Sequence, residues 1–176
     1  MFHPVKIVMS NLLQPIIEAS LVSLDLQQTE PLLSVLQFLR DLLAYGRAAP
    51  PNSNYRKTPL EVQAAVRAVA LSMGERITQR ILSGLMYSFP SDCVTDSSGV
   101  MLELVELCPM EMIQWIKSTL QLLPVGSVSP MEAQKFLTGI ETAASNKDWN
   151  KIRYTLRDFT AWYRRKNVCL IILPSS

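Results

Sequence analysis

Histidine is almost absent from this chain, because His3 is the only one among 176 residues. Histidine is the usual general base and the most common metal ligand, and it is the usual activator of a serine or cysteine nucleophile. The six glycines form no phosphate-binding loop after a strand pattern. The sequence therefore predicts a protein that is not an enzyme, with no catalytic residues, no metal site and no cofactor.

Cysteine is also scarce, with Cys93, Cys108 and Cys169 forming an odd set without the C-x-x-C spacing. This pattern indicates neither a disulfide framework nor a zinc site, and it fits a reducing compartment. Asn11, Gln14 and Pro15 interrupt the apolar N-terminal run and Glu18 follows it, so the run does not resemble a signal peptide. Uninterrupted apolar runs of about 18 residues are missing, which predicts a cytosolic or nuclear protein without a membrane span.

Charged residues make up only 18% of the chain, against the quarter that is typical of globular proteins, whereas hydrophobic residues make up 48%. We expect apolar surface to remain for a partner. The charge is also uneven: residues 1–146 carry 10 basic and 13 acidic groups, and residues 147–176 carry 7 and 2. Because the basic charge gathers at one end and forms no long track, direct nucleic-acid binding is not expected.

Helical spacing of apolar residues runs through the whole chain, without a convincing strand pattern. Thr58, followed by Pro59 and Glu61, resembles a helix start, and so do Ser129 and the residues after it. Gly74 interrupts the longest pattern and predicts a bend or a close helix contact. The expected helices span residues 5–24 with a kink at Pro15, 31–46, 59–89, 96–107, 110–123, 130–146 and 147–166.

Seven amphipathic helices with short links predict an all-α fold, a HEAT-like α-solenoid of stacked antiparallel helix pairs. Residues 1–167 would hold about three helix pairs plus an N-terminal helix, and residues 168–176 would be a disordered tail. A compact helical bundle is the rival architecture. In a solenoid segment, we expect the first helix to expose apolar residues among Ile7, Val8, Leu12, Leu13 and Ile16.

Two further patterns are an internal echo of one short sequence and a group of acidic residues. The sequence LRDLLAY at Leu39 is echoed by LRDFTAW at Leu156, and we expect these copies on opposite layers of the stack, which makes the echo a coincidence. Glu103, Glu106 and Glu111 form an acidic group around a predicted helix break. Because no histidine accompanies them, exposed carboxylates at helix ends are the preferred interpretation.

The last predicted helix, residues 147–166, combines an apolar stripe with a basic one. Spacings of three and four predict one buried stripe, formed by Trp149, Ile152, Leu156, Phe159 and Tyr163. A second stripe of arginines lies about 100° around the helix axis, where it could bind an acidic partner or simply be solvated. The candidate partner-binding residues are Arg153, Arg157, Arg164, Arg165, Lys166 and, as an exposed aromatic anchor, Trp162.

Four blocks of this sequence, spread from about Ile7 to Asn167, resemble a known family. The blocks are FLRDLLAYGR, MGERITQRILSGLMYSFP, PMEMIQWIKSTLQLLP and IRYTLRDFTAWYRRKN. In this order they are similar to the C-terminal end of a transportin-SR type nuclear import receptor, a branch of the importin-beta or karyopherin family. The ending VCLIILPSS departs from the family's usual finish.

The resemblance implies a HEAT-repeat protein that shuttles between nucleus and cytoplasm. Its cargo would be RNA-binding or serine/arginine-rich proteins, carried through the nuclear pore. It would release that cargo to the Ran GTPase, whose main binding region lies in the family's N-terminal arch and is absent here. The residues alone leave two alternatives open, namely an autonomous helical scaffold or adaptor with no transport role, and a single-strand RNA binder that uses the basic helix.

Overall fold

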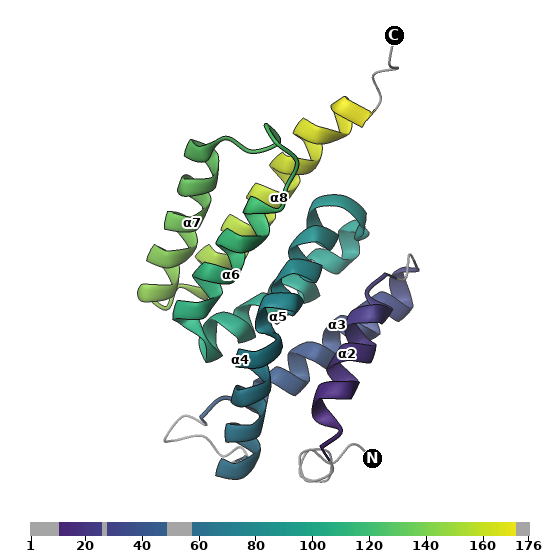
Figure 1. Cartoon of the computed structure of the whole chain (residues 1–176), viewed down its shortest axis with the longest axis vertical. Coiled ribbons are helices and arrows are strands. Elements are labelled where there is room, and N and C mark those ends of the chain that lie inside the picture. The colour runs from purple at the N-terminus through teal and green to yellow at the C-terminus, as the bar shows by residue number, and fades with distance from the viewer. Residues whose placement is uncertain (1–10, 26–27, 49–57, 172–176) are drawn as a thin grey trace.

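The computed structural model describes residues 11–25, 28–48 and 58–171, with side chains through Asn167, and this part of the chain is helical without strands (Figure 1). A π-helical turn, η1 (Gly84–Ser88), and a 3-10 turn, η2 (Ser91–Cys93), join two of the long helices. The α-helices are α2 (Leu13–Ser23), α3 (Thr29–Ala44), α4 (Leu60–Ser83), α5 (Val94–Leu107), α6 (Pro109–Gln121), α7 (Pro130–Ser145) and α8 (Trp149–Ile171).

Local sequence signals explain where several helices begin. At the start of α7, the Ser129 hydroxyl accepts a hydrogen bond from the Glu132 amide at 3.2 Å, and the Glu132 carboxylate accepts one from the Ser129 amide at 2.8 Å. This reciprocal pair is a capping box, as predicted, and it satisfies two amides at the helix end. The predicted Thr58 cap is wrong, because α4 begins at Leu60 and no side chain caps it.

Consecutive helices run in opposite directions and pack in neighbouring pairs, as in a HEAT-like α-solenoid (Figure 1). Helix α5 packs against both α3 and α8, α4 packs against α6, and α2 contacts α3 and α4. The last four helices also close on themselves, because α7 packs against both α6 and α8 while α8 packs against α5. The all-α, HEAT-like prediction is therefore confirmed, with a closed group of four helices at one end.

One hydrophobic core links the described helices. Leu36 of α3, Ile77 of α4 and Leu104 of α5 are fully buried, as are Ile116 of α6 and Ile152 of α8. At Gly74 of α4, an added Cβ would lie 2.2 Å from two ring atoms of Trp115 on α6. The close helix contact predicted at this glycine is therefore confirmed.

The two ends of the chain match the predictions only in part. Leu12 is 50% exposed, but Leu13 is buried and Ile16 is partly buried, while Ile7 and Val8 lie outside the described residues. Pro15 lies in the first turn of α2, a position that tolerates proline because the amide there has no helical partner. The backbone of α8 remains helical to Ile171, within the tail predicted for 168–176, and residues 172–176 lie outside the described part.

Candidate basic surface and the pocket between α3, α5 and α8

The apolar stripe of α8 is buried, as its spacing predicted. Ile152, Leu156 and Tyr163 are almost fully buried, and Trp149 and Phe159 are partly buried against the core. The ring of Phe159 stacks on Phe136 of α7 with 4.0 Å between ring centroids. This packing fixes the rotation of α8, so the arginines beside the stripe have a defined direction.

The basic residues of α8 divide into two groups. Arg157 pairs with its neighbour Asp158 at 3.2 Å and lies 4.9 Å from the centre of the Tyr154 ring. Lys166 lies 3.3 Å from the Glu132 carboxylate. The four others form no ion pair with any residue that the structure describes, and they are Lys151, Arg153, Arg164 and Arg165.

Trp162, predicted as an exposed aromatic anchor, is only partly exposed. Its ring packs against the core and lies 5.6 Å from the ring of Phe159, measured between centroids. The Lys166 ammonium lies 4.9 Å from the centre of the same ring, within the range of a cation–π contact. Trp162 therefore connects the core to the basic end of α8.

Arg153 borders a pocket that the sequence did not predict. The pocket has a volume of about 270 Å³ and lies where α3, α5 and α8 meet. On the α5 side, Gly99 lets the Arg40 side chain lie close to the helix, because a Cβ there would lie 2.9 Å from Cδ of Arg40. Its lining residues are Arg40, Arg47, Gly99, Leu102, Glu103, Glu106, Trp149 and Arg153.

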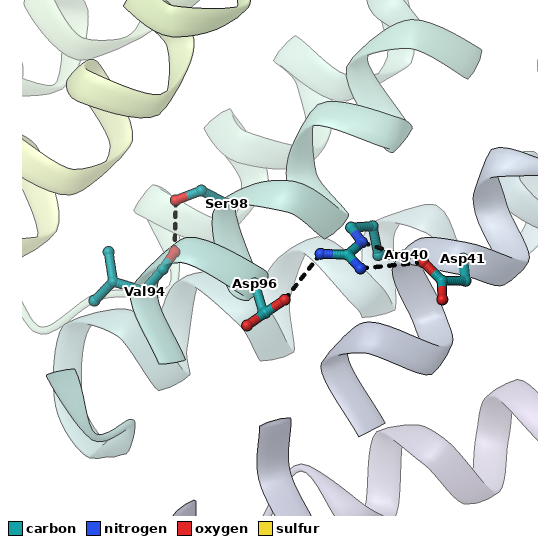
Figure 2. A network of polar contacts seen from close by, with 5 residues as sticks. All are labelled: Arg40, Asp41, Val94, Asp96 and Ser98. Atoms are coloured by element: carbon teal, nitrogen blue, oxygen red, sulfur yellow. Dashed lines mark hydrogen bonds and ion pairs between the residues drawn. The ribbon is translucent and has the colours of Figure 1, made fainter. Parts of the chain in front are cut away.

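Arg40 holds α3 against α5 through two carboxylates, as Figure 2 shows. Its Nη1 donates to Asp96 in the first turn of α5 at 2.9 Å, while Nε and Nη2 donate to Asp41 at 3.2 Å. Asp96 is only 14% exposed, so its pair with Arg40 is shielded from water more than an ordinary surface pair. This arginine is largely committed to holding the fold.

Glu103 is the most buried charged group of the pocket. Its side chain is 12% exposed and lies 3.0 Å from Nε of Arg47. Burial raises the pKa of Glu103; Arg47 and Arg40 oppose the shift, while Glu106 and Asp41 add to it. The prediction of three exposed helix-end carboxylates is therefore wrong for Glu103, although Glu106 and Glu111 are exposed.

The expected placement of the echoed sequences is also wrong. The helices that carry Leu39 and Leu156, α3 and α8, both pack against α5 and line the same pocket. Both leucines are buried, and the arginine after each one binds the next aspartate through Nε and Nη2 at 3.2 Å. The echo therefore produces the same local arrangement on two flanks of one helix.

A hydrogen bond between two tyrosines attaches η1 to α8. The hydroxyls of Tyr87 and Tyr163 are bonded to each other, and the two rings meet edge to face. Burial raises the pKa of Tyr87 to about 12, with a further contribution from the hydrogen bond to Tyr163. Tyr163 is almost fully buried, so this bond satisfies a hydroxyl that water does not reach.

The described part of the chain holds no group of three or more histidine, cysteine, aspartate and glutamate side chains that could bind a metal ion. Within the same residues, no helix has the length and apolar character needed to cross a membrane.

Comparison with known proteins gives two informative relatives, although no family model matches the chain. An uncharacterized protein of Schizosaccharomyces pombe, C11G11.07, is 30% identical over 168 residues, covering 93% of this chain. The mRNA transport regulator MTR10 of Saccharomyces cerevisiae is 22% identical over 183 residues, covering 96% of this chain. This chain spans 18% of the length of each relative. The distant similarity to MTR10 supports an importin-beta-like relationship.

Proposed function

We propose that this chain is the C-terminal, protein-binding portion of a nuclear import receptor of the transportin-SR type. The observation that carries the proposal is the similarity to an mRNA transport regulator along 96% of the chain. In this role the protein shuttles between cytoplasm and nucleus and carries RNA-binding or serine/arginine-rich proteins. Ran acts through the remainder of the receptor, and the chain has no enzymatic, membrane or direct nucleic-acid role.

The basic side of α8 is the proposed contact surface for cargo. Arg153 and Arg157 are exposed on it, and Arg164 and Arg165 continue the charge toward the end of the helix. Arginine binds carboxylates and phosphates through two parallel hydrogen bonds, which makes an acidic or phosphorylated cargo segment the matching ligand. The pair of Arg157 with Asp158 is exposed, so a cargo anion can displace it at small cost.

Charge reversal tests the contact surface. The double substitution Arg153→Glu and Arg157→Glu should weaken cargo binding, and added salt should shrink the difference from the unchanged protein, because exposed charges are screened. Thermal stability should change little, since neither side chain is part of the core. Unchanged binding at low salt would place the cargo surface elsewhere. Loss of folding would show that Arg153 and Arg157 are needed for the fold and not for binding.

The transport role itself is tested with a chimera in which this chain replaces the matching segment of MTR10. The chimera should capture protein cargo from cell extract, and Ran loaded with GTP should release it. Capture that Ran does not affect would favour the alternative of a helical scaffold or adaptor. Capture that ribonuclease abolishes would favour the alternative of an RNA-binding helix.

A further inference from the structure

The link between α6 and α7 exposes large aliphatic side chains at the end of the molecule where the last turns of α8 lie (Figure 1). Leu122 is 72% exposed, Met131 is 79% exposed, and Val125 is fully exposed. Residues 118–131 include no charged side chain, so the link carries no charge of its own. Exposed apolar side chains gathered on one segment mark a candidate interaction surface.

A tight turn from Pro124 to Ser127 holds this link in one conformation. The Ser127 amide donates to the Pro124 carbonyl at 3.0 Å, and the Ser127 hydroxyl donates to the same oxygen at 2.7 Å. Gly126 has a φ of 80°, which a type II turn requires at its third position. Ser127 is buried, so the turn is anchored while Val125 stays exposed. A partner would therefore meet a preorganised surface and lose little free energy in ordering it.

Glu132 attaches the link to α8. Its carboxylate accepts a hydrogen bond from the Ser129 amide at 2.8 Å and lies 3.3 Å from the Lys166 ammonium. Lys166 also lies over the ring of Trp162, which is partly exposed. Arg165 follows Trp162 by three residues and therefore neighbours it on the helix surface. We define the link surface as Leu122, Val125, Met131, Lys135, Trp162 and Arg165.

Positive charge exceeds negative charge at this surface. Lys135 and Arg165 are exposed and form no ion pair with any residue that the structure describes, while Glu132 is already bonded to Lys166. Asp158 is the nearest carboxylate before Arg165 on α8, and it lies about 10 Å away along the helix axis. Two cations next to exposed aliphatic side chains are therefore left without a counter-charge on α7 and α8.

We propose that the link surface binds a protein segment in which aliphatic side chains alternate with carboxylates. The aliphatic side chains pack on Leu122, Val125 and Met131, and the carboxylates pair with Lys135 and Arg165. Charge complementarity requires the carboxylates, and the exposed side chains of the link require the aliphatic groups. A nucleic-acid strand fits less well, because bases stack on aromatic rings and the exposed side chains of the link are aliphatic.

A titration followed by nuclear magnetic resonance tests the link surface directly on this chain. The probe is an N-acetylated, C-amidated peptide of sequence VLDDVLDD, which should shift the Val125 and Gly126 amides and the Trp162 indole signal with one saturating curve. The control VLNNVLNN keeps the aliphatic side chains without the charge, and SSDDSSDD keeps the charge without the aliphatic side chains. Both controls should bind at least about tenfold more weakly, because each lacks one of the two kinds of contact.

Two substitutions remove the two kinds of contact separately. Val125→Asp should weaken binding of the probe about tenfold or more, and Arg165→Gln about two- to fivefold. The matched controls are Leu60→Asp, at an exposed leucine that begins α4, and Lys151→Gln, at an unpaired cation near the start of α8. Both controls should leave the affinity unchanged. All four side chains are exposed, so the circular dichroism spectrum should not change in any variant.

Apart from Arg165, the link surface is separate from the proposed cargo surface. It lies on the α7 side of α8, whereas Arg153 borders the pocket beside α3 and α5. The double substitution Arg153→Glu and Arg157→Glu should therefore leave affinity for the probe unchanged at about 0.15 M salt, where exposed charges are screened. The proposal goes beyond the transport role and does not depend on it.

Several outcomes would overturn the link surface. They are equal affinity for the probe and either control peptide, equal losses in Val125→Asp and Leu60→Asp, and loss of probe binding in the Arg153 and Arg157 double variant. Shifts at Val125 on dilution of the protein alone would show that a second copy of the chain covers the surface instead. Shifts caused by phosphatidylserine vesicles or by a single-stranded oligonucleotide, and not by the probe, would replace the protein segment with a lipid or nucleic-acid ligand.

Discussion

Replacement of Gly74 by alanine should destabilise the protein, although alanine is the better helix former. In an exposed helix the change would stabilise by about 1 kcal/mol. Here the new Cβ would lie 2.2 Å from two atoms of the Trp115 ring, whereas carbon atoms in contact are about 3.5–4.0 Å apart. Trp115 is only 9% exposed, so its ring cannot move into solvent without disturbing α4 and α6.

Overpacking of this kind typically costs about 1–3 kcal/mol, so we expect the two effects to sum to a net loss of about 0–2 kcal/mol. Urea unfolding followed by circular dichroism measures the difference. The same substitution made in a Trp115→Leu background should stabilise, because the ring that opposes the Cβ is gone. A Gly74→Ala protein that is more stable than the parent, or an equal effect in both backgrounds, would refute the proposed contact.

Three other predictions concern single interactions. Ser129→Ala should lower the free energy of unfolding by about 1 kcal/mol in urea, because it removes the cap of α7. Tyr87→Phe should cost about 1–3 kcal/mol in the same assay by leaving the buried Tyr163 hydroxyl unpaired, and the double change to phenylalanine should cost less. The folded-state pKa of Glu103 is raised, so this group favours folding at low pH and that contribution is lost as pH rises through its unfolded and then its folded pKa. Glu103→Gln should therefore raise stability relative to the parent at neutral pH, and the advantage should disappear in acid.

Features that depend on residues close together in the sequence could be predicted, whereas features that depend on contacts between distant residues could not. Ser129 and Glu132 lie three residues apart, so the start of α7 could be predicted from a local motif. The buried stripe of Ile152, Leu156 and Tyr163 could be predicted equally well, because helical periodicity alone determines which residues share a face.

The pocket could not be predicted in the same way. Arg40, Gly99 and Arg153 are far apart in sequence and meet only because α5 packs between α3 and α8. The burial of Glu103 depends on that arrangement, and so does the shared neighbour of the two echoed sequences. The echo was a usable signal, but its interpretation required knowing that α8 returns against α5.

The closed group formed by α5, α6, α7 and α8 has a mechanical consequence. Each of these helices is held on two sides within the group, whereas α2 is held through α3 and α4. A stacked array transmits load from neighbour to neighbour, and a closed group resists shear because sliding one helix disturbs two interfaces. We expect the molecule to bend between α2 and α4 and to remain stiff from α5 onward, so slow amide exchange should extend across α5 to α8 as one cooperative unit. The pocket between α3, α5 and α8 lies at the edge of this stiff region, with Arg153 inside the region and Arg40 and Arg47 on the part that bends.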